Sequence, residues 1–195
     1  MSSPTTPHDP VDTAAAAEAA RDRRARITWS LIAEPSDAVA LLACTVLGHT
    51  TALELAENGT SPDLLRALGG QLPSQAAEPG GMSPSTRAQR AMDRWQERRK
   101  VIDLDAVLVD AERRGLRILT PQDPEWPRGL DDLQETRPHC LWAAGPGILD
   151  QLAGDRSLAL VGSRASTPYG EDTAGSFAAA FAAGGGTVVS GGAYG

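Results

Sequence analysis

One stretch near the end of the chain constrains the fold more than any other: residues 157–170, which read SLALVGSRASTPYG. Its apolar run, residues 158–161, is uninterrupted, as expected of a strand covered on both faces. A glycine loop follows, then a helix from about residue 169 to 183, then a second apolar run at 187–189 that again ends in glycines. This order predicts one βαβ unit, whose two strands end at the same edge of a parallel sheet. In open α/β sheets that edge binds ligands.

The loop after the first of these strands has the composition of an anion site. Backbone N–H groups at the start of a helix carry a partial positive charge, which favours phosphate. Ser163 offers a hydroxyl donor, and the guanidinium of Arg164 suits phosphate oxygens. A tight turn that binds nothing would need only the glycine, so the arginine favours a ligand. The predicted phosphate-binding residues are Gly162, Ser163, Arg164, Thr167, Tyr169, Ser190, Gly191 and Gly192.

Several chemistries are excluded by what these loops lack. No Gly-Lys-Ser/Thr follows Gly162, so the loop is not a P-loop, and Gly-Ser-Arg is not the GxGxxG dinucleotide fingerprint. No Ser–His–Asp or Cys–His set is apparent, so we expect no catalytic residues and no cofactor. Cys44 and Cys140 are far apart, without a CxxC pattern or a nearby histidine partner. We therefore expect no metal site and a reducing compartment.

Composition sets the broad class of protein. The 195 residues could form one large domain or two small ones, and 41% hydrophobic residues suffice for a folded core. The formal net charge of -7 argues against a nucleic-acid footprint over the whole surface, but not against a local basic pocket. No apolar run approaches the ~18 residues of a membrane helix, and the first residues lack a signal-peptide pattern. We expect a cytoplasmic protein with no membrane partner.

The patterns along the chain predict five regions of an α/β protein. Residues 1–26 read as a disordered or helical tail, 27–69 as an all-helical module, 70–85 as a flexible linker, and 86–115 as connecting helices. Residues 116–195 read as the first part of a Rossmann-like parallel sheet. In the helical module, Asp37 should cap a helix whose apolar face is Val39, Leu42, Val46 and Leu47.

Two helical regions raise the question of DNA contact. Short helices with tight glycine turns are typical of SAM-like or helix-hairpin-helix modules, but the turn at Gly48-His49 matches that pattern poorly. The arginines at 21–26 and the basic stripe of residues 86–100 could touch a phosphate backbone. The arginines at 21–26 are also explained by a solvated helix face that binds nothing. The stripe at 86–100 is also explained by an amphipathic helix that buries Met92 and Trp95.

These motifs together resemble the DNA-processing protein A (DprA, also called Smf) family. The similarity lies in LALVGSRASTPYGE, TVVSGGAYG, the upstream ILTPQDPEWPRGLDDL and CLWAAG, and the helical module, which resembles the family's SAM-like domain. It spans residues 27–195. The Gly-Ser-Arg loop, the PxDPxWP turn and the SGGAYG strand end are far more specific in this order than any one of them alone.

The resemblance implies a non-enzymatic protein that binds single-stranded DNA in a pocket of an extended Rossmann fold. It also implies protection of incoming DNA during natural transformation, assistance in loading the RecA recombinase, and a homodimer. Gly162, Ser163 and Arg164 match the family's DNA-phosphate motif, and Ser190, Gly191 and Gly192 match the neighbouring loop. Tyr169 and Tyr194 are possible surfaces for base stacking, with a core or capping role for Tyr169 as the alternative.

The sequence departs from the family in one respect: the family continues beyond SGGAYG, so we expect an apparently truncated chain that lacks most of the dimer surface. A fragment without a function of its own is one alternative. Another is an enzyme like the cytokinin-activating phosphoribohydrolases, whose Rossmann-like sheet opens with a similar phosphate loop. Those enzymes need a PGGxGTxxE-type segment, and none occurs here.

Overall fold

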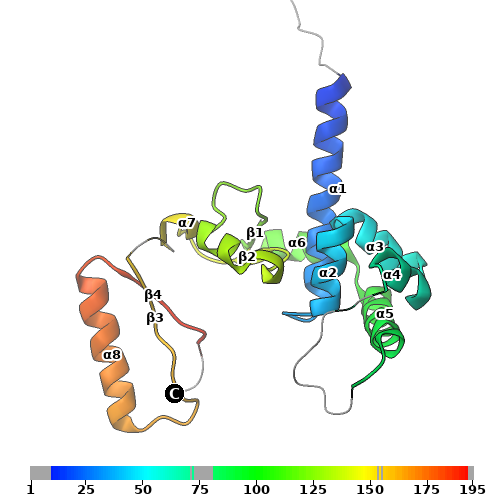
Figure 1. The fold of residues 1–195 in the computed structure, drawn as a ribbon. Coiled ribbons are helices and arrows are strands. Elements are labelled where there is room, and N and C mark those ends of the chain that lie inside the picture. Colours follow the sequence, from blue (N-terminus) through cyan, green and yellow to red (C-terminus); the bar gives the residue numbers. More distant parts are fainter. Residues whose placement is uncertain (1–9, 71, 73–80, 153, 155, 193–195) are drawn as a thin grey trace, which may run out of the picture. The chain divides into compact units, whose positions relative to one another are not determined.

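A computed structural model describes residues 10–70, 72, 81–152, 154 and 156–192, and it divides into two compact units. The first, here called the helical unit, comprises Met1–Pro121 and Leu133–Gly145. The second, here called the βαβ unit, comprises Gln122–Asp132 and Pro146–Gly195. Figure 1 shows the elements of both. The first nine residues of the predicted tail, most of the predicted linker and Tyr194 lie outside the described residues.

Six helices form most of the helical unit. They are α1 (Pro10–Ile32), α2 (Ala38–Leu47), α3 (His49–Asn58), α4 (Ser61–Ala67), α5 (Pro84–Val101) and α6 (Leu104–Arg113). Local signals set several of their starts: Ser83 caps α5 and Asp103 caps α6 through side-chain oxygens, while Thr60 and Asp63 form a capping box at α4. Helix α1 runs unbroken through residues 26 and 27, so the predicted tail and the predicted module share one helix.

The core of the helical unit is built around two tryptophans. Trp29 of α1 and Trp95 of α5 are fully buried, with ring centroids 5.0 Å apart in an edge-to-face arrangement. Met92, Ala88 and Ala91 are buried with Trp95, which confirms the predicted inner face of α5. The predicted face of α2 was wrong at Val46, which is exposed. Its buried residues are Val39, Ala40, Ala43 and Cys44.

Asp37 ties α2 to α5. It caps α2, as predicted, because its side chain accepts hydrogen bonds from the backbone N–H groups of Val39 and Ala40. Its second carboxylate oxygen accepts from the indole of Trp95 at 3.1 Å and from Arg94 at 3.0 Å. Burying a charged carboxylate costs free energy unless it is hydrogen-bonded and paired, as Asp37 is here.

Ion pairs occupy most of the basic stripe on α5. Besides the Arg94–Asp37 pair, the stripe's charges meet acidic partners on other elements and on α5 itself: Arg98 with Glu34, Arg99 with Glu57, and Lys100 with Glu97. These contacts favour the amphipathic interpretation of α5. Two arginines of α1 do not lie on a solvated face, contrary to what the sequence had suggested. Arg26 is buried beside Asp22, and Arg23 donates a hydrogen bond to the carbonyl of Ile118.

Two short strands complete the helical unit. Strands β1 (Arg117–Leu119) and β2 (Leu141–Ala143) pair antiparallel, with Ile118 opposite Trp142, and the 3₁₀ segment η1 (Arg128–Thr136) lies between them in sequence. Residues 116–195 were predicted to form one parallel sheet, but β1 and β2 form a separate antiparallel sheet of two strands. The sequence could not predict this pairing, because a three-residue strand carries no signal for its partner.

The βαβ unit contains α7 (Leu149–Leu152), β3 (Ser157–Ala159), α8 (Pro168–Ala183) and β4 (Thr187–Val189). Strands β3 and β4 pair in parallel, which confirms that part of the α/β prediction. Neither strand is covered on both faces as expected: Ala159 and Val189 are exposed, and Leu158 and Val188 are half-buried. Among the described residues of this unit, the sheet consists of these two strands alone.

Among the described residues, no single helix has the length and hydrophobicity needed to cross a membrane. Helices α2 and α3 would meet those criteria only if combined, and they are bent by 120° relative to each other.

Candidate anion-binding site

The two predicted loops leave the sheet of the βαβ unit at the same edge. Ala159 pairs with Val189, and beyond that pair the N–H of Leu160 donates to the carbonyl of Val189 at 2.8 Å. The chain therefore enters the loops at 160 and 190 from neighbouring positions. The parallel pairing, not any direct contact between loops, fixes this proximity.

A pocket of about 530 Å³ lies at this edge. Five of the predicted residues line it: Gly162, Ser163, Thr167, Ser190 and Gly191. Six further lining residues were not predicted: Leu160, Val161, Ala165, Ser166, Gly170 and Ala174. Gly170 and Ala174 lie one turn apart on α8. This spacing of small residues on one helix face is the sequence signal that could have predicted them as pocket residues. The lining combines hydroxyls with small apolar surface and includes no ionisable side chain.

The serine hydroxyls in these loops are partly engaged by their own backbone. Ser163 Oγ donates to the carbonyl of Ala165 at 3.0 Å and accepts from the N–H of Ala165 at 3.2 Å. Ser190 Oγ accepts from the N–H of Gly192 at 3.3 Å. Ser163 was predicted to offer a hydroxyl donor to a ligand, and in this conformation its hydroxyl bonds to the local backbone, as short polar side chains in turns do. These hydroxyls shape the pocket wall.

The start of α8 is satisfied by its own residues. Thr167 is the N-cap and accepts from the N–H of Gly170 at 3.2 Å, while Pro168 follows with no N–H to offer. Glu171, in the first turn, accepts from Ser166 Oγ at 2.7 Å and places a negative charge near the positive end of the helix dipole. The helix end alone is therefore a weaker attraction for an anion than the sequence predicts.

Arg164 is the cation closest in sequence to this pocket. It lies between the lining residues Ser163 and Ala165, is exposed, and forms no hydrogen bond or ion pair with the described residues. An arginine in this state keeps all its donors available. Tyr169, which is 80% exposed, and Gly192 do not line the pocket.

Among the described residues, nothing requires a glycine at position 162. Its φ lies outside the left-handed region, and a Cβ added there would meet nothing within 4 Å. Gly192 differs, because its φ of +64° favours glycine. Without a Cβ, the backbone at position 162 is open to close approach by a ligand.

Two comparisons with known proteins gave matches. Residues 117–195 match the family model described as DNA recombination-mediator protein A. Two relatives, from two strains of Mycobacterium tuberculosis, are described as a DNA processing protein DprA. Each is 40% identical over 124 residues, which cover 58% of this chain and 29% of the relative. No solved structure matches the chain significantly.

The chain thus spans less than a third of the length of the curated relatives it matches. The aligned positions outnumber the residues matched by the family model, so the similarity extends upstream of the βαβ unit. The matched segment includes the whole pocket, from Leu160 to Gly191. On this evidence residues 117–195 are similar to the DNA recombination-mediator protein A (DprA) family.

Proposed function

We propose that this chain takes part in DNA processing during recombination, without catalysis, by binding single-stranded DNA at the pocket of the βαβ unit. The observation that carries the proposal is the joining of two glycine–serine loops into one pocket, within the segment that matches the family. A phosphate group would sit against the bare backbone at Gly162 and Gly191, with the hydroxyl-bearing wall around it.

Arg164 supplies the charge that this site needs. The pocket lining is uncharged and the chain is acidic overall, at -7, so general electrostatic attraction does not favour DNA. A phosphate contact from an exposed, unpaired arginine beside the pocket would provide a local positive charge. Hydrogen bonds to charged groups are worth about 1.5–3 kcal/mol, enough to make one residue decisive.

Arg164→Ala is expected to weaken binding of a fluorescent oligo-dT strand about 10- to 100-fold, measured by anisotropy against salt concentration. The slope of log affinity against log salt should fall by about 0.7, the value of one phosphate contact on a single strand. Arg90→Ala is the matched control, because Arg90 is an exposed arginine of α5 with no partner among the described residues. It removes the same charge from the helical unit.

Two results would contradict the proposal. Equal losses in the Arg164 and Arg90 variants would show a non-specific charge effect, and an absence of salt-sensitive affinity in the parent chain would remove DNA as the ligand. Release of free base from a nucleoside monophosphate would instead support a phosphoribohydrolase-like enzyme.

Gly162→Ala is expected to leave the free energy of unfolding within about 0.5 kcal/mol of the parent, since its Cβ meets open space. The same Cβ should reduce oligo-dT affinity about three- to tenfold by holding phosphate away from the backbone, the value of one ordinary hydrogen bond. Gly175→Ala is the control, because position 175 also has open space but lies on α8 outside the pocket lining. Unchanged affinity in the Gly162 variant would place the ligand elsewhere.

The finer parts of the proposal concern partners. The resemblance to this family supports a role in natural transformation, protection of incoming DNA, assistance in loading RecA, homodimer formation and a cytoplasmic location. A pull-down of RecA with the chain, with and without oligo-dT, tests the RecA partner directly.

A further inference from the structure

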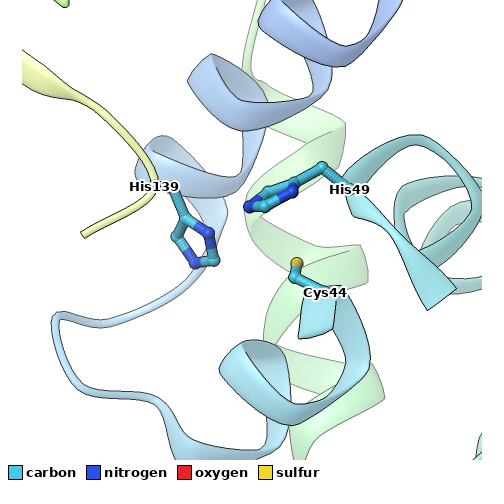
Figure 2. Close-up of side chains that lie close together, drawn as sticks. All are labelled: Cys44, His49 and His139. Carbon is cyan, nitrogen blue, oxygen red and sulfur yellow. The ribbon is translucent and has the colours of Figure 1, made fainter. Parts of the chain in front are cut away.

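Three metal-ligating side chains converge in the helical unit. Cys44 lies on α2, His49 is the first residue of α3, and His139 lies two residues before β2 (Figure 2). One ligand atom from each lies within 4.8 Å of the other two. Cys44 therefore does have histidine partners in space, contrary to the sequence-based expectation.

The fold holds both histidines against one buried tryptophan. The indole N–H of Trp29 donates to the backbone carbonyl of His49 at 3.1 Å, and the Trp29 ring stacks on His139 with centroids 5.9 Å apart. Helices α2 and α3 are bent by 120° at Gly48, whose φ is +78°, and this turn places His49 beside Cys44. The three positions are thus set by the core of the helical unit.

We propose that Cys44, His49 and His139 bind a zinc ion. A thiolate and two imidazoles are the ligand types that zinc prefers, and three protein ligands with an open fourth position is an established zinc arrangement. With bonds of about 2.0–2.3 Å, tetrahedral ligand atoms lie roughly 3.5 Å apart. The ligand atoms lie within 4.8 Å of one another, so the cluster must close by up to about 1.3 Å. Side-chain rotations are sufficient for that movement.

One carboxylate lies near a ligand of the cluster. Asp22 Oδ1 is 3.8 Å from His49 Nδ1, beyond hydrogen-bond distance, and a shorter approach on zinc binding would orient the imidazole with its other nitrogen toward the metal. A pocket of about 520 Å³ opens onto the cluster and is lined by Asp22, Cys44, His49 and His139 among others. Water can reach the fourth position of the zinc through it.

Protonation of the ligands is compatible with metal binding. Burial, with Arg26 as the next cause, lowers the pKa of His49 to about 3 and that of His139 to about 4, so both imidazoles are neutral at pH 7. Burial raises the pKa of the Cys44 thiol, which must release its proton to solvent as the S–Zn bond forms. The charged groups that face the cluster are Asp22, Arg26, Asp37 and Arg137. Arg26 is paired with Asp22 at 2.7 Å, which offsets its repulsion of a cation.

The test is titration of the chelator-stripped chain with Zn²⁺ in competition with a chromophoric chelator, together with the absorption spectrum of the Co²⁺-loaded chain. We expect one equivalent of Zn²⁺ per chain and a thiolate-to-cobalt charge-transfer band. Cys44→Ser should remove the band and weaken Zn²⁺ binding by at least 100-fold. Cys140→Ser is the matched control, because Cys140 is also a buried free cysteine but lies outside the cluster.

No stoichiometric Zn²⁺ binding, or the same loss in both serine variants, would overturn the proposal. A further measurement covers the case in which the Cys44 variant does not fold, as judged by circular dichroism. In the unmodified chain, Zn²⁺ should protect Cys44 from alkylation while Cys140 reacts at the same rate with and without metal. Equal alkylation of Cys44 in the two conditions would also overturn it.

Discussion

Replacing Asp37 with alanine is expected to lower the free energy of unfolding of the helical unit by about 3–5 kcal/mol. The carboxylate is 6% exposed and accepts four hydrogen bonds, two from the first turn of α2 and two from α5. Its loss removes a helix cap, leaves the buried indole N–H of Trp95 without an acceptor, and leaves Arg94 without its partner. Urea unfolding followed by circular dichroism and tryptophan fluorescence measures the change.

Two variants separate these contributions. Asp37→Asn keeps an acceptor of the same shape but removes the charge, so a smaller loss than for alanine is expected. Asp103→Ala removes another N-cap, that of α6, which is exposed and bonds only the N–H of Ala106 among the described residues. Its cost should be about 0.5–2 kcal/mol. Equal losses at Asp37 and Asp103 would show that Asp37 acts only as a cap.

Helix boundaries in this chain were predictable because their causes are local. Asp37 capping α2 and Pro62 opening α4 need only their immediate neighbours. The buried face of α2 was not predictable from large apolar residues, since alanines and Cys44 face the core while Val46 faces solvent. Those small side chains belong to the same core cluster as Trp29 and Trp95.

Strand pairing was harder to predict. The parallel pair of β3 and β4 follows from one short crossover through α8, which topology rules favour strongly. The antiparallel pair of β1 and β2 joins residues separated by the 120–140 segment, and neither strand exceeds three residues. Strands this short show no alternation of apolar and polar residues, and partners this far apart in sequence cannot be matched from the sequence.

The two candidate sites also differ in whether neighbouring or distant residues form them. The pocket at Gly162 was predicted because its loops flank one βαβ unit, although the bonding of Ser163 to Ala165 was not. Whether the Ser163 hydroxyl bonds to a ligand or to its own backbone depends on the loop conformation, which the sequence does not specify. The cluster at Cys44 was missed because His139 lies far along the chain and joins through tertiary packing against Trp29.

Lowering the pH from 6.5 towards 4, with a chelator present, is expected to destabilise the helical unit. The pKa of His49 falls to about 3 and that of His139 to about 4 in the folded chain, from 6.5 for the ordinary side chain. Between those values the unfolded chain binds more protons, so stability rises with pH and is lost on acidification. Each imidazole contributes at most about 1.4 kcal/mol per pH unit in that window. Urea unfolding at pH 7, 6.5, 6, 5.5 and 5 measures the slope.

The double variant His49→Gln, His139→Gln is the control, because glutamine keeps hydrogen-bonding capacity without titrating near neutral pH. Its free energy of unfolding should change little between pH 6.5 and 5, and the difference in slope from the parent isolates the imidazoles from carboxylates that titrate at lower pH. Arg26, Asp22, Asp37 and Arg137 face the same cluster and are retained in both chains. An equal slope in the two would mean that these histidines become protonated without cost, which their burial beside Arg26 opposes.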